Sequence, residues 1–224
     1  MRIDEWIVIH DTQGYSETED FKELETMITN AIEGMHNPPG SGKFLLRPST
    51  ANELIEGTNK KRGKRSGKTV NGVGAIKEPF IDYLTAITGW KTEKKVDLGV
   101  GECDVVYYYD DERLPFIVEW ETGNISSTHR AVNRILSSIM RGVASGGVLI
   151  LPSREMYRHL TDRVGNAGEI QGYLDLWRKA DNLSDKPYYF AFVVIEHDEL
   201  SNDVPYFAAG NDGNSFRVSE EGVI

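Results

Sequence analysis

Three acidic residues of this chain have the spacing of a divalent-metal site. Glu119 and Glu121 lie two residues apart in a run rich in β-branched and aromatic residues, which predicts a strand over 114–121. Alternate side chains of a strand leave the same face, so both carboxylates are expected on one side. Asp104 precedes a second run of this kind, over 105–109, and a short charged turn joins the two runs into an antiparallel hairpin. The three carboxylates are therefore expected to converge at a strand end.

Carboxylate oxygens are ligands of hard divalent cations. A bound Mg²⁺ polarises a phosphoryl oxygen, lowers the pKa of a bound water and orients an in-line displacement. The alternative is three solvated carboxylates on a hairpin, in a chain that has 35 acidic residues. Two glutamates separated by one residue are common on strands, so the carboxylates alone favour this plainer interpretation. The sequence that follows them favours the metal site.

The composition describes an ordinary globular protein. The chain has 224 residues, of which 39% are hydrophobic and 27% charged, and this length predicts one domain with a sizeable core. Cys103 is the only cysteine, which excludes a disulfide framework and favours a reducing interior. The first residues show no secretory pattern, and no segment has the length of apolar residues needed to span a bilayer. We therefore expect a cytoplasmic protein without a membrane partner.

The basic residues are unevenly distributed. A formal net charge of −10 argues weakly against a nucleic-acid partner, because phosphate binding rewards clustered lysine and arginine. However, a basic loop at about 58–70 contains Lys60, Lys61, Arg62, Lys64, Arg65 and Lys68. Such runs are usually solvated surface, but in this acidic chain a phosphate contact is at least as well supported.

Hydrophobic periodicity indicates the elements that must position the carboxylates. Helices are predicted over 17–36, 77–88, 126–143, 154–160 and 168–180. Besides the hairpin, continuous apolar runs predict strands over 147–151 and 188–195. The segment 41–75 and a C-terminal tail at about 200–224 are predicted to be irregular. This order predicts an α/β fold with a central mixed β-sheet flanked by helices.

The helix after the acidic strand combines an apolar face with basic residues. Gly123 ends the strand, and the residues from Asn124 to Ser127 can cap the helix. Arg130, Arg134 and Arg141 lie off its apolar face. A helix N-terminus also presents free N–H groups and a positive dipole end. Together these features suit a polyanion bound beside the carboxylates.

The segment 119–130, EWETGNISSTHR, resembles the catalytic and recognition segment of the BamHI-like type II restriction endonucleases. Stretches within 71–78, 160–164 and 201–213 resemble this family in the same order, so the resemblance covers roughly residues 70 to 217. It implies a restriction-endonuclease-like fold of the PD-(D/E)XK superfamily, in the variant with glutamate in place of the usual lysine. It also implies a Mg²⁺-dependent nuclease that forms one domain over 1–224 and acts as a homodimer on palindromic double-stranded DNA. A cognate DNA methyltransferase is then expected in the host.

The resemblance also implies roles for the acidic residues. Asp104 and Glu119 match the metal ligands, and Glu121 matches the residue that helps to activate the attacking water. Glu93 matches a fourth acidic residue near the catalytic site, with Asp97 as a competing candidate. The chemistry expected is hydrolysis of a phosphodiester bond, in which water attacks in line with the leaving 3′ oxygen.

For base readout, the resemblance points to Asn124, Ser126, Arg130, Asp162 and Arg163. Their donors and acceptors suit the major groove, where arginine pairs with guanine and aspartate accepts from cytosine. Arg130 and Arg163 with Asp162 would read the outer G·C pairs, and Asn124 and Ser126 the inner ones. The expected site is GGATCC, cut after the first G to leave 5′ overhangs, with a related or relaxed GATC-centred site as the alternative.

Two further expectations concern the protein as a whole. Lys77 is a candidate for a base or phosphate contact. Because twofold DNA requires a twofold protein, a homodimer is predicted. The apolar face of the helix over 126–143 is longer than one small core needs, so this helix and the helix over 168–180 are predicted to form the dimer interface. Alternative functions are a nuclease of the same superfamily with a repair role, a DNA-binding protein that has lost catalysis, and an acidic protein unrelated to nucleic acid. The intact carboxylates disfavour the second, and the joint presence of carboxylates and readout residues disfavours the third.

Overall fold

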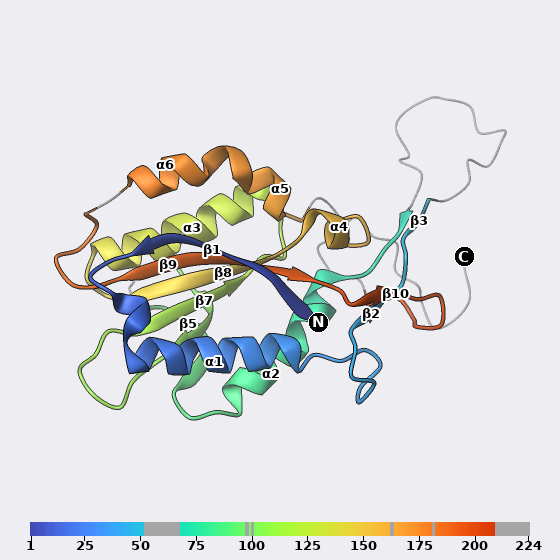
Figure 1. Ribbon diagram of the computed structural model, residues 1–224, viewed down its shortest axis with the longest axis horizontal. Coiled ribbons are helices and arrows are strands. Elements are labelled where there is room, and N and C mark those ends of the chain that lie inside the picture. The colour runs from blue at the N-terminus through green and yellow to red at the C-terminus, as the bar shows by residue number, and fades with distance from the viewer. Residues whose placement is uncertain (52–67, 97–98, 100, 162–163, 181, 209–224) are drawn as a thin grey trace.

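The computed structural model describes residues 1–51, 68–96, 99, 101–161, 164–180 and 182–208, and all structural statements below refer to these ranges (Figure 1). The predicted basic loop up to residue 67 and the predicted tail beyond residue 208 lie outside the described residues.

A six-stranded mixed sheet in the order β1-β9-β8-β7-β6-β5 forms the centre of the described structure. Its strands are β1 (Arg2–Asp11), β5 (Trp90–Lys94), β6 (Cys103–Tyr107), β7 (Phe116–Trp120), β8 (Gly146–Pro152) and β9 (Tyr189–Glu196). Strands β7, β8 and β9 are parallel, whereas β1 runs antiparallel to β9, β6 to β7, and β5 to β6. The predicted central mixed sheet is therefore confirmed.

Helices cover both faces of this sheet (Figure 1). On one face lie α1 (Glu19–Glu33) and α2 (Val73–Thr85), whose apolar residues pack with Val118 and Trp120 of β7. On the other face lie α3 (Ile125–Met140) and α6 (Leu174–Lys179), which pack with Ile117 of β7. Because β8 and β9 are covered on both faces, all their residues are buried, which explains why their sequences are continuously apolar.

Shorter elements complete the described chain. They are η1 (Tyr15–Glu17), α4 (Arg154–Tyr157), α5 (Ala167–Ile170), η2 (Gln171–Tyr173) and four two-residue strands, β2 (Leu45–Leu46), β3 (Thr50–Ala51), β4 (Lys68–Thr69) and β10 (Glu199–Leu200). β10 pairs with β2, and β3 pairs with β4. Among the described residues, no helix is long and apolar enough to cross a membrane.

The observed elements differ from the predicted ones at several points. The two edge strands, β1 and β5, were not predicted, because an edge strand tolerates charged residues that interrupt an apolar pattern. The helix predicted from residue 77 begins at Val73, so Pro79 lies inside it and not near its start. The helix predicted over 168–180 is divided into α5, η2 and α6, and the helix predicted over 154–160 ends at Tyr157.

Candidate active site

The β6–β7 hairpin brings the first acidic residue to the strand of the other two. Val105 pairs with Val118 in the predicted antiparallel arrangement. Asp104 Oδ2 accepts a hydrogen bond from the backbone N–H of Trp120 at 2.9 Å. Trp120 is the residue between Glu119 and Glu121, so this bond holds the Asp104 carboxylate against the strand that carries both glutamates. Trp120 packs on the α2 face with its ring centroid 5.0 Å from that of Phe80, as the predicted alternation of side chains requires.

Two basic side chains contact these carboxylates. Lys77 Nζ, from α2, donates to Asp104 Oδ1 at 2.9 Å. Arg134 Nη1, from α3, donates to Glu119 Oε1 at 2.6 Å. Because α2 and α3 lie on opposite faces of the sheet, one basic side chain reaches the carboxylates from each face.

Burial, together with the nearby negative charge of Asp104, raises the pKa of Glu119 to about 7, against the opposing effect of Arg134. The residue is only 4% exposed, so little water is available to stabilise its charge. The ion pair with one arginine is thus insufficient to keep the pKa of this buried carboxyl in its ordinary range.

Glu121 occupies a second buried environment, at 3% exposure. Its Oε1 accepts from the N–H of Gly123 at 2.7 Å, and the Thr128 hydroxyl lies beside the carboxylate. Burial nevertheless raises the pKa of Glu121 to about 7, despite these neighbours. Within the described residues, neither Glu121 Oε2 nor Thr128 Oγ1 makes a hydrogen bond of normal geometry, so both buried oxygens can still serve a water or an ion.

The arrangement fits a divalent cation in its chemistry but does not form a completed binding cage. The donors are hard carboxylate oxygens, of the kind that Mg²⁺ prefers, and Glu121 Oε2 is unsatisfied among the described residues. However, the described residues contain no group of three His, Cys, Asp or Glu side chains positioned to hold a metal ion. The predicted convergence of all three carboxylates on one point is therefore not found, because Lys77 and Arg134 hold the oxygens of Asp104 and Glu119.

The predicted readout residues at the start of α3 lie together on the surface. Asn124 is the N-cap, and its Oδ1 accepts from the backbone N–H groups of Ser126 at 3.0 Å and Ser127 at 3.4 Å. Ser126 and Arg130 are exposed one helical turn apart, and Arg130 Nη2 donates to Ser127 Oγ at 2.8 Å. The capping bonds occupy the carbonyl oxygen of Asn124, so its amide N–H₂ is the part suited to a DNA contact.

Three of the other predicted residues receive no side-chain assignment. Asp162 and Arg163 lie outside the described residues, although Val164, which follows them, forms a β-bridge with Asn124. Asp97 also lies outside. Glu93 lies on β5 between Thr92 and Lys94, which pair with Val105 and Cys103, so its backbone is opposite that of Asp104.

Three residues of the site were missed as site residues by sequence reasoning. Arg134 lies four residues after Arg130 and could have been found from this helical spacing. Thr128 is fully buried beside Glu121, and Gly165 lies against both, since a Cβ at Gly165 would be 1.9 Å from Thr128 Oγ1. No local pattern identifies Thr128 or Gly165, because their contact joins segments far apart in the sequence.

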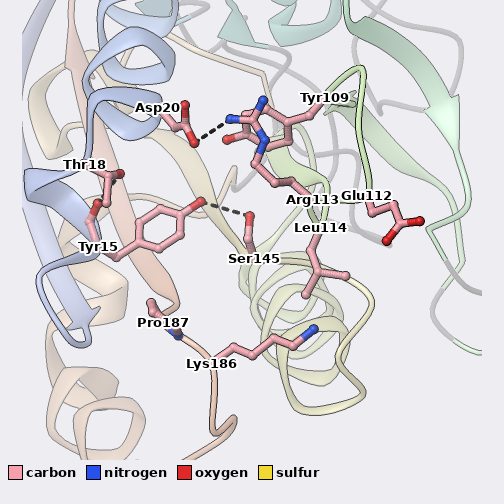
Figure 2. Close-up of a pocket in the computed structure, with 10 residues that line it drawn as sticks. All are labelled: Tyr15, Thr18, Asp20, Tyr109, Glu112, Arg113, Leu114, Ser145, Lys186 and Pro187. Carbon is pink, nitrogen blue, oxygen red and sulfur yellow. Dashed lines mark hydrogen bonds and ion pairs between the residues drawn. The ribbon is translucent and has the colours of Figure 1, made fainter.

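A cavity of about 350 Å³ lies elsewhere, between η1, the β6–β7 turn and the segment before β9 (Figure 2). The Tyr15 hydroxyl donates to Ser145 Oγ at 2.9 Å across it, and Arg113 pairs with Asp20 at 2.6 Å. Leu114, which lines this cavity, precedes β7, whereas Glu121 follows β7. The cavity is thus at the end of the strand remote from the carboxylates and contains none of the predicted site residues.

A mixed sheet that presents buried carboxylates from a hairpin, directly before the exposed N-terminus of a helix, is the arrangement expected of a nuclease with the restriction-endonuclease-like fold. The chain matches the restriction endonuclease BamHI family over residues 1–214. It is 38% identical over 194 residues to the type II restriction enzyme OkrAI of Oceanobacter kriegii, a match that covers 85% of this chain and 88% of the relative. It is 31% identical over 158 residues to the type II restriction enzyme BamHI of Bacillus amyloliquefaciens, covering 67% and 70% of the two chains.

The chain therefore belongs to the BamHI restriction endonuclease family, as the resemblance of its 119–130 segment indicated. It is a type II restriction endonuclease, a site-specific deoxyribonuclease that acts on double-stranded DNA. The family match also extends to residues before 70, where sequence reasoning identified no shared motif.

Proposed function

We propose that this enzyme hydrolyses GGATCC sites after the first G in a Mg²⁺-dependent reaction and leaves 5′ overhangs. The observation that carries the proposal is the pair of buried glutamates, Glu119 and Glu121, directly before the exposed N-terminus of α3. A phosphate of DNA bound at this helix end would lie close to the carboxylates, because only Thr122 and Gly123 separate Glu121 from the cap residue.

Asp104 and Glu119 are the proposed metal ligands, and either Glu93 or Asp97 is the further acid. A bound Mg²⁺ would supply charge stabilisation to the phosphate oxygens and lower the pKa of a coordinated water. Glu121 is proposed to accept a proton from the attacking water. Its pKa of about 7 suits a general base at neutral pH, and its unsatisfied Oε2 is available for a water.

Base readout is proposed to use the residues at the start of α3 together with Asp162 and Arg163. Arg130 is exposed and suited to guanine O6 and N7, and Arg163 with Asp162 would complete the outer G·C pairs. Asn124 would donate its amide N–H groups to an acceptor of an inner base, since its oxygen caps α3, and Ser126 would contact the inner pair beside it. Lys77 remains a candidate for a phosphate contact.

The proposed working form is a homodimer of one endonuclease domain over 1–224, with one subunit cutting each strand. Its target DNA places the enzyme in the cytoplasm of its host. Unmodified sites in the host's own DNA would be cut, so a cognate DNA methyltransferase is proposed to accompany it.

Digestion of a plasmid of known sequence, with the fragment ends sequenced, tests this proposal. Discrete ends at GGATCC that require Mg²⁺ and are lost with Glu119→Ala are expected. Discrete ends at another GATC-centred sequence would refute the proposed site while leaving the reaction intact. Cleavage that persists in Glu119→Ala would refute the assignment of the metal ligand.

A further inference from the structure

Lys77 and Arg134 contact the same atoms that a metal ion would need. Lys77 engages Asp104 Oδ1, and the remaining oxygen of Asp104 accepts from Trp120 N–H. Arg134 engages Glu119 Oε1. Both oxygens of Asp104 and one oxygen of Glu119 thus already have protein hydrogen-bond partners.

The positive charges of Lys77 and Arg134 also oppose the binding of a divalent cation. Lys77 and Arg134 place two positive charges against Asp104 and Glu119, so each of these two carboxylates already has a partner of opposite charge. The side chain of Glu119 is 5% exposed and that of Arg134 is 26% exposed, so solvent screens this pair incompletely. Lys77 and Asp104 are similarly enclosed, at 23% and 26%. A divalent cation entering the site would be repelled by both basic groups at short range.

We propose that Lys77 and Arg134 are positioning residues that neutralise the metal-free site and compete with the divalent cation for Asp104 and Glu119. This inference rests on the proposed function, because it takes these two acids as the metal ligands. Metal binding then requires both basic side chains to leave their carboxylates. A purely structural role predicts the opposite sign, since loss of an ion pair that merely orients a ligand weakens metal binding.

Calorimetric titration of the full chain with Mg²⁺, and separately with Mn²⁺, in the absence of DNA distinguishes these roles. Lys77→Gln and Arg134→Gln are each expected to bind the cation more tightly than the wild type, by on the order of tenfold for the loss of one nearby like charge. Lys77→Arg and Arg134→Lys, which keep the charge, are expected to bind like the wild type. Lys22→Gln is the matched control, because Lys22 is an exposed lysine of α1 whose ion pair is with Glu19.

Thermal unfolding supplies a second readout that does not depend on activity. Without metal, Arg134→Gln is expected to melt below the wild type, because Glu119 is left buried without its partner. Added Mg²⁺ is expected to raise the melting temperature of this variant more than that of the wild type, because ligand binding to the folded state is linked to stability. The same comparison applies to Lys77→Gln if one variant cannot be purified in folded form.

Metal affinities of both glutamine variants that equal that of Lys22→Gln, or fall below the wild type, would overturn the inference. So would the absence of measurable binding in every variant at millimolar metal. The proposed function fails separately: it is refuted if the wild type does not cut the plasmid in Mg²⁺. Cleavage by the wild type together with unaltered metal affinity in the variants would overturn the competition alone.

Discussion

Asp104, Glu119 and Glu121 have similar chemistry in isolation but different partners in the folded protein. Asp104 is part-buried and accepts from a lysine and a backbone N–H. Glu119 is buried against an arginine, whereas Glu121 is buried with one oxygen unsatisfied. These differences support the separate tasks proposed for the three groups, and the environment of Glu121 best suits the proton transfer proposed for it.

The contact between Gly165 and Thr128 provides a test of how tightly Glu121 is enclosed. Gly165→Ala is expected to destabilise the protein by about 1–3 kcal/mol, because the new methyl group would overlap the buried Thr128 hydroxyl. Urea denaturation measures the change. Cleavage is expected to fall as well, since the added atom also lies 3.4 Å from Glu121 Cγ.

Two variants control this prediction. Gly74→Ala adds a methyl group where no atom lies within 4 Å, and is expected to leave stability unchanged or slightly raised. Thr128→Ala combined with Gly165→Ala removes the overlapping oxygen and is expected to recover most of the lost stability. If the double variant is as unstable as Gly165→Ala, the overlap is not the cause.

The buried carboxylate of Glu196, outside the site, contributes to the pH dependence of stability. Glu196 accepts from the Ser153 hydroxyl and from the His197 N–H. Burial alone would raise its pKa, but the hydrogen bonds and charge of His197 and the bond from Ser153 outweigh burial, so the pKa of Glu196 is lowered. A lowered pKa stabilises the folded state above the ordinary range of glutamate, and this contribution is lost as the pH falls through the folded-state pKa.

The melting temperature of the wild type is therefore expected to fall between about pH 5 and pH 3, and that of Glu196→Gln to depend less on pH there. Differential scanning calorimetry across this range measures both slopes. Glu25→Gln, on the exposed side of α1, is the control and should keep the slope of the wild type. Equal slopes for wild type and Glu196→Gln would contradict the assignment.

At the scale of elements, α3 connects the acidic strand to the predicted readout residues. Its first residues follow the acidic strand after a single turn, and its N-cap is a predicted readout residue. On its buried side, Val132 and Ile135 fix the helix to the sheet, while Arg134 reaches Glu119. A shift of this helix would therefore move the predicted readout residues at its start and also disturb the contact between Arg134 and Glu119.

Substitutions at Asn124 can separate its capping role from its proposed readout role. Asn124→Ala is expected to cost about 1 kcal/mol of stability through loss of the cap and also to weaken DNA binding. Asn124→Asp keeps an acceptor for the Ser126 and Ser127 N–H groups and places a negative charge at the helix N-terminus, so stability should be retained. It lacks the amide donor and repels phosphate, so binding to a GGATCC duplex should fall.

Chemical denaturation and fluorescence anisotropy in metal-free buffer measure the two properties independently. Wild-type affinity in Asn124→Asp would show that Asn124 serves only as a cap. A loss of stability in Asn124→Asp equal to that of Asn124→Ala would refute the capping contribution instead.

At the scale of the whole molecule, one surface has the character of an interface. Met140 of α3, Leu176 of α6 and Tyr173 of η2 are large apolar residues with exposed fractions of 61%, 65% and 41%. All three elements cover the same face of the sheet (Figure 1). His129 of α3 stacks edge-on against Tyr173 at 4.5 Å, so this surface is continuous from α3 to η2. These residues support the proposed dimer interface.

Leu176→Glu is expected to give a folded monomer that has lost most double-strand cleavage, because a charge would be buried in the interface. Sedimentation velocity at micromolar concentration measures the assembly, and circular dichroism checks the fold. Tyr83→Glu changes a 43% exposed residue of α2, on the opposite face, and is expected to leave the dimer intact. A wild-type protein that sediments as a monomer under these conditions would refute the dimer.

Local patterns in the sequence were sufficient for much of the fold and for the family. The hairpin, the helix after Gly123 and the strands at 147–151 and 188–195 follow from periodicity and capping, which act over a few residues. The edge strands β1 and β5 were not accessible in this way, because their assignment depends on neighbours distant in sequence. The predictions for Asp162 and Arg163 lie outside the described residues.

By itself, the sequence determined the family and predicted the acidic and readout residues, because a short motif such as 119–130 is typical of one kind of site. Only the tertiary structure decided how those acids are neutralised. Lys77 and Asp104 are 27 residues apart, and Arg134 and Glu119 are 15 apart, on elements from opposite faces of the sheet. Charge compensation acts through space, so it depends on how α2, α3 and the hairpin pack together.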